Sequence, residues 1–187
     1  RSVTTVVYRD GVFAWDSQAT YQNRGVNGIT KVIQNGPVVF GACGTARSLN
    51  IIKHMPIPAM REYEPDFDTE RWIINTLVPA IRVALVEVNA AEIQHHIVHT
   101  GGSFIVSVNG VVGYIDSSLA FFQDDTGLYG IGSGAAYALG AMKAGATPKE
   151  AVETAKYFDL YTGGEINTLD LTPKEPKKKS KKSLDKK

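Results

Sequence analysis

Short runs of β-branched and aromatic residues, separated by turn residues, open the chain. Val3–Tyr8 and Val12–Trp15 are two such runs, and the Asp10-Gly11 pair between them is typical of a hairpin turn. The pattern recurs at Lys31–Ile33 and Val38–Gly41. The first forty residues therefore predict two β-hairpins.

Longer stretches with helical composition and capping signals follow in two groups. The predicted helices cover residues 45–54, 70–91, 135–144 and 148–158. Asp68 or Thr69 would cap the second helix, and Pro79 inside it predicts a kink or a break. Thr147 and Glu150 have the spacing of a capping box for the last helix.

Further strands lie between and after these helices. Ser103–Val108 and Val111–Ile115 flank Asn109-Gly110 and predict the clearest hairpin of the chain. Leu128–Ile131 and Ile166–Leu169 predict two more strands. Because strands and helices come in blocks rather than alternating, the chain predicts an α+β domain and not a doubly wound parallel sheet.

The charge is unevenly distributed along the 187 residues. Residues 1–173 carry 12 basic and 17 acidic side chains, a net of −5, whereas residues 174–187 carry eight lysines and two acidic residues, a net of +6. We expect residues 172–187 to form a disordered tail, because they hold too little apolar surface to offset the entropy of ordering. The tail is interpreted as solubilising, or as docking to nucleic acid or an acidic surface through Lys177, Lys178, Lys179, Lys181 and Lys182, and we favour the first.

The remaining composition narrows the class of protein. At 43% hydrophobic and 21% charged residues, the chain has the profile of one globular domain. Its apolar runs fall short of the roughly 18 residues that a membrane-spanning helix needs, and no secretory leader is expected. Cys43 is the single cysteine, which excludes an internal disulfide and favours a reducing, cytoplasmic location.

Signatures of cofactor or metal chemistry are weak. Gly130, Gly132 and Gly134 are too closely spaced for a dinucleotide fingerprint, and no ATP-binding motif occurs. His95 and His99 have the spacing of one helical turn, but no third zinc ligand is evident, so we interpret them as a solvated helix end. No cofactor and no metal are expected, and Cys43 is interpreted as a small buried hydrophobe.

Threonines near the chain start are better candidates for chemistry. A threonine hydroxyl can act as a nucleophile when its own α-amine, with a pKa near ~7.7, takes the proton. This requires a threonine on a strand beside a lysine and a carboxylate. Thr4 and Thr5 precede the first strand, Asp16 ends the second and Lys31 begins the third.

Five motifs in the same order resemble the proteasome β-subunit and HslV peptidase family of N-terminal-nucleophile hydrolases, especially its small bacterial and phage members. They are Thr4-Thr-Val-Val, Gly11-Val-Phe-Ala-Trp-Asp16-Ser-Gln-Ala-Thr20, Ile29-Thr-Lys31-Val, Gly41-Ala-Cys-Gly44 and Gly130-Ile-Gly-Ser133-Gly134. The ending Tyr161-Thr-Gly-Gly164 is similar too. The resemblance covers residues 4–171 and implies a four-layer αββα sandwich.

The resemblance also implies a role for each matching residue. Thr4 would be the nucleophile, Lys31 would lower the pKa of its amine, and Asp16 would orient Lys31. The amide of Gly44 would stabilise the oxyanion, and Ser133 would hydrogen-bond near the Thr4 amine. Without the resemblance, the same residues could form an ordinary ion pair, a tight turn and a helix N-cap.

Three features separate this chain from the family pattern. Residues 1–3 precede Thr4, so they are either a propeptide remnant or a sign that the site is silent. The first hairpin is short, and the period of two along a strand favours Thr4 over Thr5 as the nucleophile. Trp15 stands where a small residue is typical, and we expect it to narrow or obstruct the substrate pocket.

The functional prediction is a threonine-type endopeptidase that cleaves polypeptides inside a homo-oligomeric ring. A separate ATP-dependent unfoldase would unfold the substrates. One alternative is a non-catalytic assembly module or phage structural subunit, and another is an amidase acting on small molecules. The acidic loop from Arg61 to Glu70 is a candidate contact surface.

Overall fold

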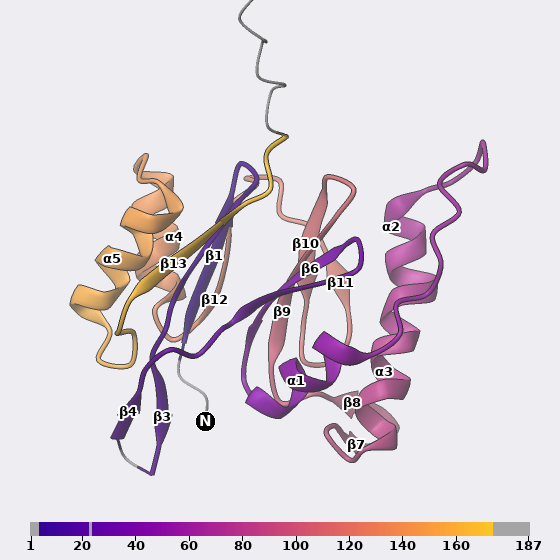
Figure 1. Ribbon diagram of the computed structural model, residues 1–187, viewed down its shortest axis with the longest axis horizontal. Helices are drawn as coiled ribbons and strands as arrows, with labels where there is room; N and C mark the ends of the chain where they lie inside the picture. The colour runs from indigo at the N-terminus through magenta and orange to yellow at the C-terminus, as the bar shows by residue number, and fades with distance from the viewer. Residues whose placement is uncertain (1–3, 23, 174–187) are drawn as a thin grey trace, which may run out of the picture.

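Four antiparallel strands from the two ends of the chain form the first main sheet (Figure 1). Their order is β12 (Tyr129–Gly132), β1 (Thr5–Arg9), β2 (Val12–Asp16) and β13 (Ile166–Asp170). The structure is a computed structural model and describes residues 4–22 and 24–173. The predicted turn between β1 and β2 is confirmed, because Asp10 and Gly11 have φ of 49° and 83°, as the favoured two-residue turn requires.

A second antiparallel sheet lies against the first. Its order is β11 (Phe121–Phe122), β10 (Val111–Ile115), β9 (Ser103–Val108), β6 (Val38–Cys43) and β5 (Val32–Asn35). Both hairpins predicted for this region are confirmed, and Val108 pairs with Val111 across the Asn109-Gly110 turn. The two sheets enclose an apolar cluster that includes Val6, Trp15 and Ile105.

Helices cover the outer face of each sheet (Figure 1). The first sheet packs against α4 (Ala135–Lys143) and α5 (Pro148–Phe158), where Val7 and Ala14 meet Met142 and Val152. The second sheet packs against α1 (Ala46–His54), α2 (Thr69–Trp72), the π-helix η1 (Ile73–Leu77) and α3 (Val78–Glu87). The predicted α+β class is therefore confirmed. Within the described residues, no helix is both long and apolar enough to span a membrane.

The helix predicted around Pro79 is continuous but changes its winding. Asp68 caps it by accepting from Arg71 N, and the amide of Val78 bonds to the carbonyl of Ile73, five residues earlier. Because Pro79 has no N–H, it cannot continue the four-residue pattern, and the wider π-turn accommodates it. The helix ends at Glu87, earlier than predicted.

Two small hairpins were not predicted. One pairs β3 (Ala19–Tyr21) with β4 (Arg24–Val26), and the other pairs β7 (Glu92–Gln94) with β8 (Ile97–His99). The interpretation of the histidines as a helix end is wrong, because His95 and His96 form the β7–β8 turn with φ of 49° and 68°. Short, polar strands of three residues carry too little hydrophobic alternation to be recognised.

The capping box of α5 provides a test of local stability. Thr147 Oγ1 accepts from the Glu150 amide, and Glu150 bonds back to the Thr147 amide at 2.8 Å. We expect Thr147→Ala to lower the free energy of unfolding by about 1 kcal/mol, because a donor at the helix start loses its partner. Chemical denaturation measures this, and Thr147→Ser should retain most of the stability.

Candidate active site

The two threonines at the start of β1 have different environments. The amide of Thr5 donates to Asp16 Oδ1 at 2.8 Å, and its hydroxyl contacts Thr162 Oγ1 at 2.6 Å while accepting from the Gly134 amide at 3.1 Å. Thr162 gives its own hydroxyl proton to Asp159 Oδ2 at 2.6 Å, so Thr5 must donate to Thr162. The Thr5 hydroxyl is therefore fully engaged.

Thr4 lies on the opposite face of the strand, in line with Val6 of the inter-sheet cluster. It is 1% exposed, and its hydroxyl has one long contact of 3.4 Å, to Asp16 Oδ1. Its carbonyl accepts from the Ser133 amide at 2.8 Å. Thr4 therefore has its backbone fixed, and its hydroxyl is held less tightly than that of Thr5.

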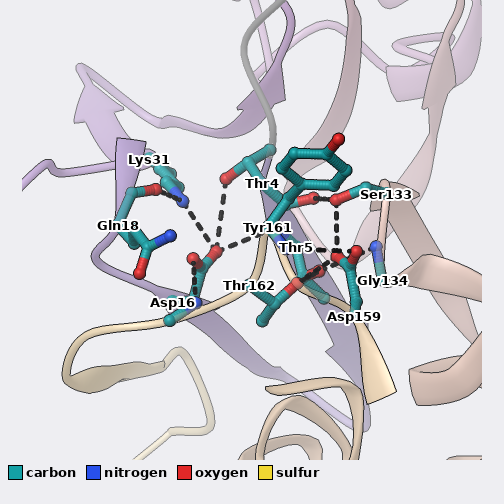
Figure 2. A network of polar contacts seen from close by, with 11 residues as sticks. Thr4, Thr5, Asp16, Gln18, Lys31, Ser133, Gly134, Asp159, Tyr161 and Thr162 are labelled. Carbon is teal, nitrogen blue, oxygen red and sulfur yellow. Dashed lines mark hydrogen bonds and ion pairs between the residues drawn. The ribbon is translucent and has the colours of Figure 1, made fainter. Parts of the chain in front are cut away.

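Asp16 and Lys31 form a buried ion pair beside Thr4 (Figure 2). Lys31 Nζ lies 2.7 Å from Asp16 Oδ1, and the two side chains are 5% and 0% exposed. Asp16 Oδ2 accepts from the Gly163 amide at 3.0 Å, and Lys31 also donates to the Gln18 carbonyl. Burial lowers the pKa of Lys31, and the Asp16 charge opposes this shift. The ammonium is thus held in place beside the Thr4 hydroxyl.

Ser133 is on the other side of Thr4 (Figure 2). Its hydroxyl donates to Asp159 Oδ2 at 2.6 Å and lies 3.4 Å from the Thr4 carbonyl. The alternative of a helix N-cap is wrong, because Gly134 is the N-cap of α4 and no side chain caps this helix. Since its single proton is given to Asp159, the Ser133 oxygen keeps lone pairs beside Thr4.

Asp159 and Thr162 are parts of the site that sequence reasoning missed. Asp159 follows α5 and accepts from both Ser133 and Thr162, so it connects α4, α5 and β1. The motif Tyr161-Thr-Gly-Gly164 pointed to this segment. The acidic residue two positions before it was the available signal, but one aspartate at a helix end has many structural explanations.

Gly44 lies between β6 and α1 in a conformation that requires glycine. Its φ is +112°, and a Cβ there would lie 2.4 Å from Gly102 Cα and 2.6 Å from the Gly101 carbonyl oxygen. Gly44 lines a cavity of about 340 Å³ together with Lys31, Ile33, Ala42 and Leu49. Gly44 and Lys31 therefore face the same space.

Substitution of Gly44 tests whether this backbone conformation is needed. We expect Gly44→Ala to lower the free energy of unfolding by about 1–3 kcal/mol, since it adds strain and a steric overlap with backbone atoms. Gly110→Ala is the matched control, because Gly110 has φ of +75° with no atom within 4 Å of an added Cβ. Equal losses in the two variants, measured by denaturation, would contradict a steric requirement at Gly44.

Cys43 and Trp15 differ in their relation to this cavity. Cys43 is half-buried and lines the cavity, and burial raises the pKa of its thiol. The interpretation as a buried hydrophobe is therefore only partly right. Trp15 packs in the inter-sheet cluster and is not among the residues lining this cavity, so it does not narrow this cavity. Its indole nitrogen is buried without a hydrogen-bond partner in the described part of the chain.

The structure thus joins four of the five predicted site residues, Thr4, Asp16, Lys31 and Ser133, in one network of polar contacts (Figure 2). Gly44 joins them through the shared cavity. The predicted propeptide remnant (residues 1–3) and the lysines of the predicted tail (residues 174–187) lie outside the described residues. No group of three or more potential metal ligands occurs among residues 4–22 and 24–173.

Comparisons with solved structures identify the fold. The chain is similar to Thiobacillus denitrificans BPH, with a TM-score of 0.68 and 19% identity over 92% of this chain and 100% of that chain. BPH in complex with epoxomicin gives a TM-score of 0.67 and 19% identity, over 91% and 100% of the two chains. Eukaryotic HslV from Trypanosoma brucei gives 0.56 and 18% identity, over 90% and 99%. These similarities show the fold of proteasome β-like N-terminal-nucleophile hydrolases.

Sequence comparisons add nothing to this result. Neither known family profiles nor curated protein sequences match the chain. At 18–19% identity, the structural similarity shows a common fold and leaves the chemistry to be derived from the residues of this chain.

Proposed function

We propose that this chain, with its proteasome β-like fold, is a threonine-type peptidase whose nucleophile is Thr4. The observation that carries the proposal is the network around Thr4: a weakly held hydroxyl, a buried Asp16–Lys31 pair and an anchored carbonyl. The helix–sheet–sheet–helix order is interpreted as the αββα sandwich of N-terminal-nucleophile hydrolases. Residues 4–171 would form this domain.

In the proposed reaction, Thr4 Oγ1 attacks the carbonyl carbon of the scissile bond. The Thr4 amine takes the hydroxyl proton, and the amide of Gly44 stabilises the oxyanion. When the carbon–nitrogen bond breaks, that proton passes to the departing amine and an ester to Thr4 remains. Water then cleaves this ester, releasing the second product and restoring the hydroxyl.

The polar residues around Thr4 would adjust its amine. The Lys31 ammonium disfavours a second positive charge nearby and so lowers the pKa of the amine, which keeps it free to accept a proton near neutral pH. Asp16 holds Lys31 in place. The Ser133 oxygen, whose proton is given to Asp159, accepts a hydrogen bond from the amine after it has been protonated.

This chemistry requires a free amine on Thr4. Residues 1–3 precede Thr4 in the sequence, so the proposal includes cleavage of the Val3–Thr4 peptide bond. A chain that keeps Val3 would carry an amide nitrogen there, which cannot act as a base. Such a chain would be a non-catalytic assembly subunit.

Polypeptides are the proposed substrates. The cavity beside Gly44 is lined by aliphatic residues, among them Ile29, Ile33 and Leu49, and by polar residues that include Lys31 and Lys53. Its volume of about 340 Å³ suits one side chain of a peptide, namely the one before the scissile bond. A homo-oligomeric ring, an ATP-dependent unfoldase and a cytoplasmic location remain parts of the proposal. A small-molecule amide could also occupy a cavity of this volume, so an amidase is the alternative that substrate tests must separate from the peptidase.

The test combines the mature N-terminus with covalent labelling. Intact-mass analysis of the purified protein should give a chain beginning at Thr4. Epoxomicin, the ligand of the BPH structure, should add its mass to that chain at the Thr4 residue. Thr5→Ser should be labelled normally. A chain that retains residue 3 and is not labelled would refute the peptidase proposal and favour the assembly subunit.

A further inference from the structure

Exposed aromatic side chains gather at the end of α5, next to the candidate active site. Tyr157, Phe158 and Tyr161 are 85%, 59% and 52% exposed, and Tyr137 of α4 is 47% exposed. Tyr137 and Phe158 stack with ring centroids 5.5 Å apart. Large apolar side chains in water beside a reactive group mark a surface that binds something.

Tyr161 is distinguished from the others by where its backbone is fixed. Its amide donates to Asp159 Oδ1 at 3.3 Å, and it lies between two residues that hold the site, Asp159 and Thr162. Two positions later, the amide of Gly163 donates to Asp16 at 3.0 Å. The segment carrying Tyr161 is therefore tied to both sides of the site.

Figure 2 shows the ring of Tyr161 on the Ser133 side of Thr4, away from Lys31. The aliphatic cavity that Gly44 lines is on the other side, since Lys31 is part of its wall. A peptide that reaches Thr4 must place the part before the scissile bond and the part after it on opposite sides of the attacked carbon. If the first part occupies the cavity, the second part leaves across Tyr161.

We infer that Tyr161 determines specificity for the residue that follows the scissile bond, and that it favours an apolar or aromatic side chain there. The inference rests on the proposed peptidase function and names a further property of its substrate. An aromatic ring in contact with a phenylalanine or leucine side chain is worth roughly a 2- to 10-fold preference over a residue with no side chain. The tyrosine hydroxyl is not needed for this contact.

The experiment uses three substrates with one sequence before the scissile bond. Two are internally quenched peptides with phenylalanine or glycine directly after the bond, and the third is a peptide methyl ester, whose leaving group is too small to reach the ring. We expect the wild-type protein to hydrolyse the ester and to prefer phenylalanine over glycine by about 5-fold in kcat/KM. Tyr161→Ala should reduce this ratio to about one, and Tyr161→Phe should retain it.

Tyr157→Ala is the matched control, because Tyr157 belongs to the same group of exposed aromatics without lying between site residues. It should keep the phenylalanine preference. A preference that survives in Tyr161→Ala, while the ester is still hydrolysed, would overturn the inference and leave the proposed function intact. Equal effects of Tyr157→Ala and Tyr161→Ala, with a change of oligomeric state by light scattering, would instead assign the aromatic residues to subunit contact. No hydrolysis of any substrate by the wild-type protein would overturn both proposals.

Discussion

Thr4→Ala should abolish peptide hydrolysis, with a fall in kcat of at least about 10³-fold, because the substitution removes the attacking oxygen. The fold should be retained, since the Thr4 carbonyl still accepts from Ser133 and the Thr4 hydroxyl is held by a single long hydrogen bond, 3.4 Å to Asp16. The measurement is the initial rate on a quenched peptide, together with thermal unfolding of the same preparation.

Two variants make this result specific. Thr4→Ser keeps the hydroxyl and should keep measurable activity. Thr5→Ser keeps the hydrogen bonds to Thr162 and Gly134 and should resemble the wild type. Activity that persists in Thr4→Ala but disappears in Thr5→Ala would move the nucleophile by one residue and contradict the proposed site.

Lys31→Met should give the second large effect, a loss of about 10²- to 10³-fold in kcat/KM. It removes the positive charge near Thr4, the proposed nucleophile, while keeping a long side chain in the cavity wall. Without this charge the pKa of the Thr4 amine rises, so the acid limb of the pH–rate profile should move to higher pH by about one unit or more. A pH profile of kcat/KM measures the shift, which loss of structure alone would not produce.

In Lys31→Met, a loss of stability must be distinguished from the expected loss of activity. Asp16 keeps its bonds to the amides of Thr5 and Gly163, but it remains a buried charge without its cation, at a cost of about 3–5 kcal/mol. Lys31→Arg retains the charge, and Lys143→Met removes a lysine from the exposed face of α4. An unchanged pH profile in folded Lys31→Met would contradict the role proposed for Lys31.

The sequence was most informative where structure depends on local patterns. The Asp10-Gly11 and Asn109-Gly110 turns and the Thr147–Glu150 capping box each depend on a few neighbouring residues, and all were predicted. The winding of the helix at Pro79 was predicted only as a kink or a break, because local propensity does not say how a chain accommodates a missing donor. The turn at His95 and His96 was missed because it lacks the Asn-Gly or Asp-Gly pair that marks a two-residue hairpin turn.

The site was predicted in part for a different reason. Thr4, Asp16 and Lys31 were found through the order of motifs along the first two hairpins. Asp159 belongs to the site through its hydrogen bond to Ser133, and Thr162 through its hydrogen bond to Thr5 at the start of the first strand. Thr5 and Thr162 are 157 positions apart in the sequence. No spacing in the sequence shows such contacts. The sequence likewise does not show which face of β2 packs against the second sheet, and this decides where the Trp15 side chain lies.

The pairing of the two chain ends in one sheet has a consequence for biosynthesis. Asp16 ends β2, near the start of the chain, but its Oδ2 accepts a hydrogen bond from the amide of Gly163. The strand that pairs with β2, β13, consists of residues 166–170 and is synthesised late. A ribosome that has released the first 150 residues has produced Thr4 and Lys31 without the loop that orients them. The proposed site thus stays incomplete on the nascent chain, and a truncated translation product would carry Thr4 without the residues proposed to orient it.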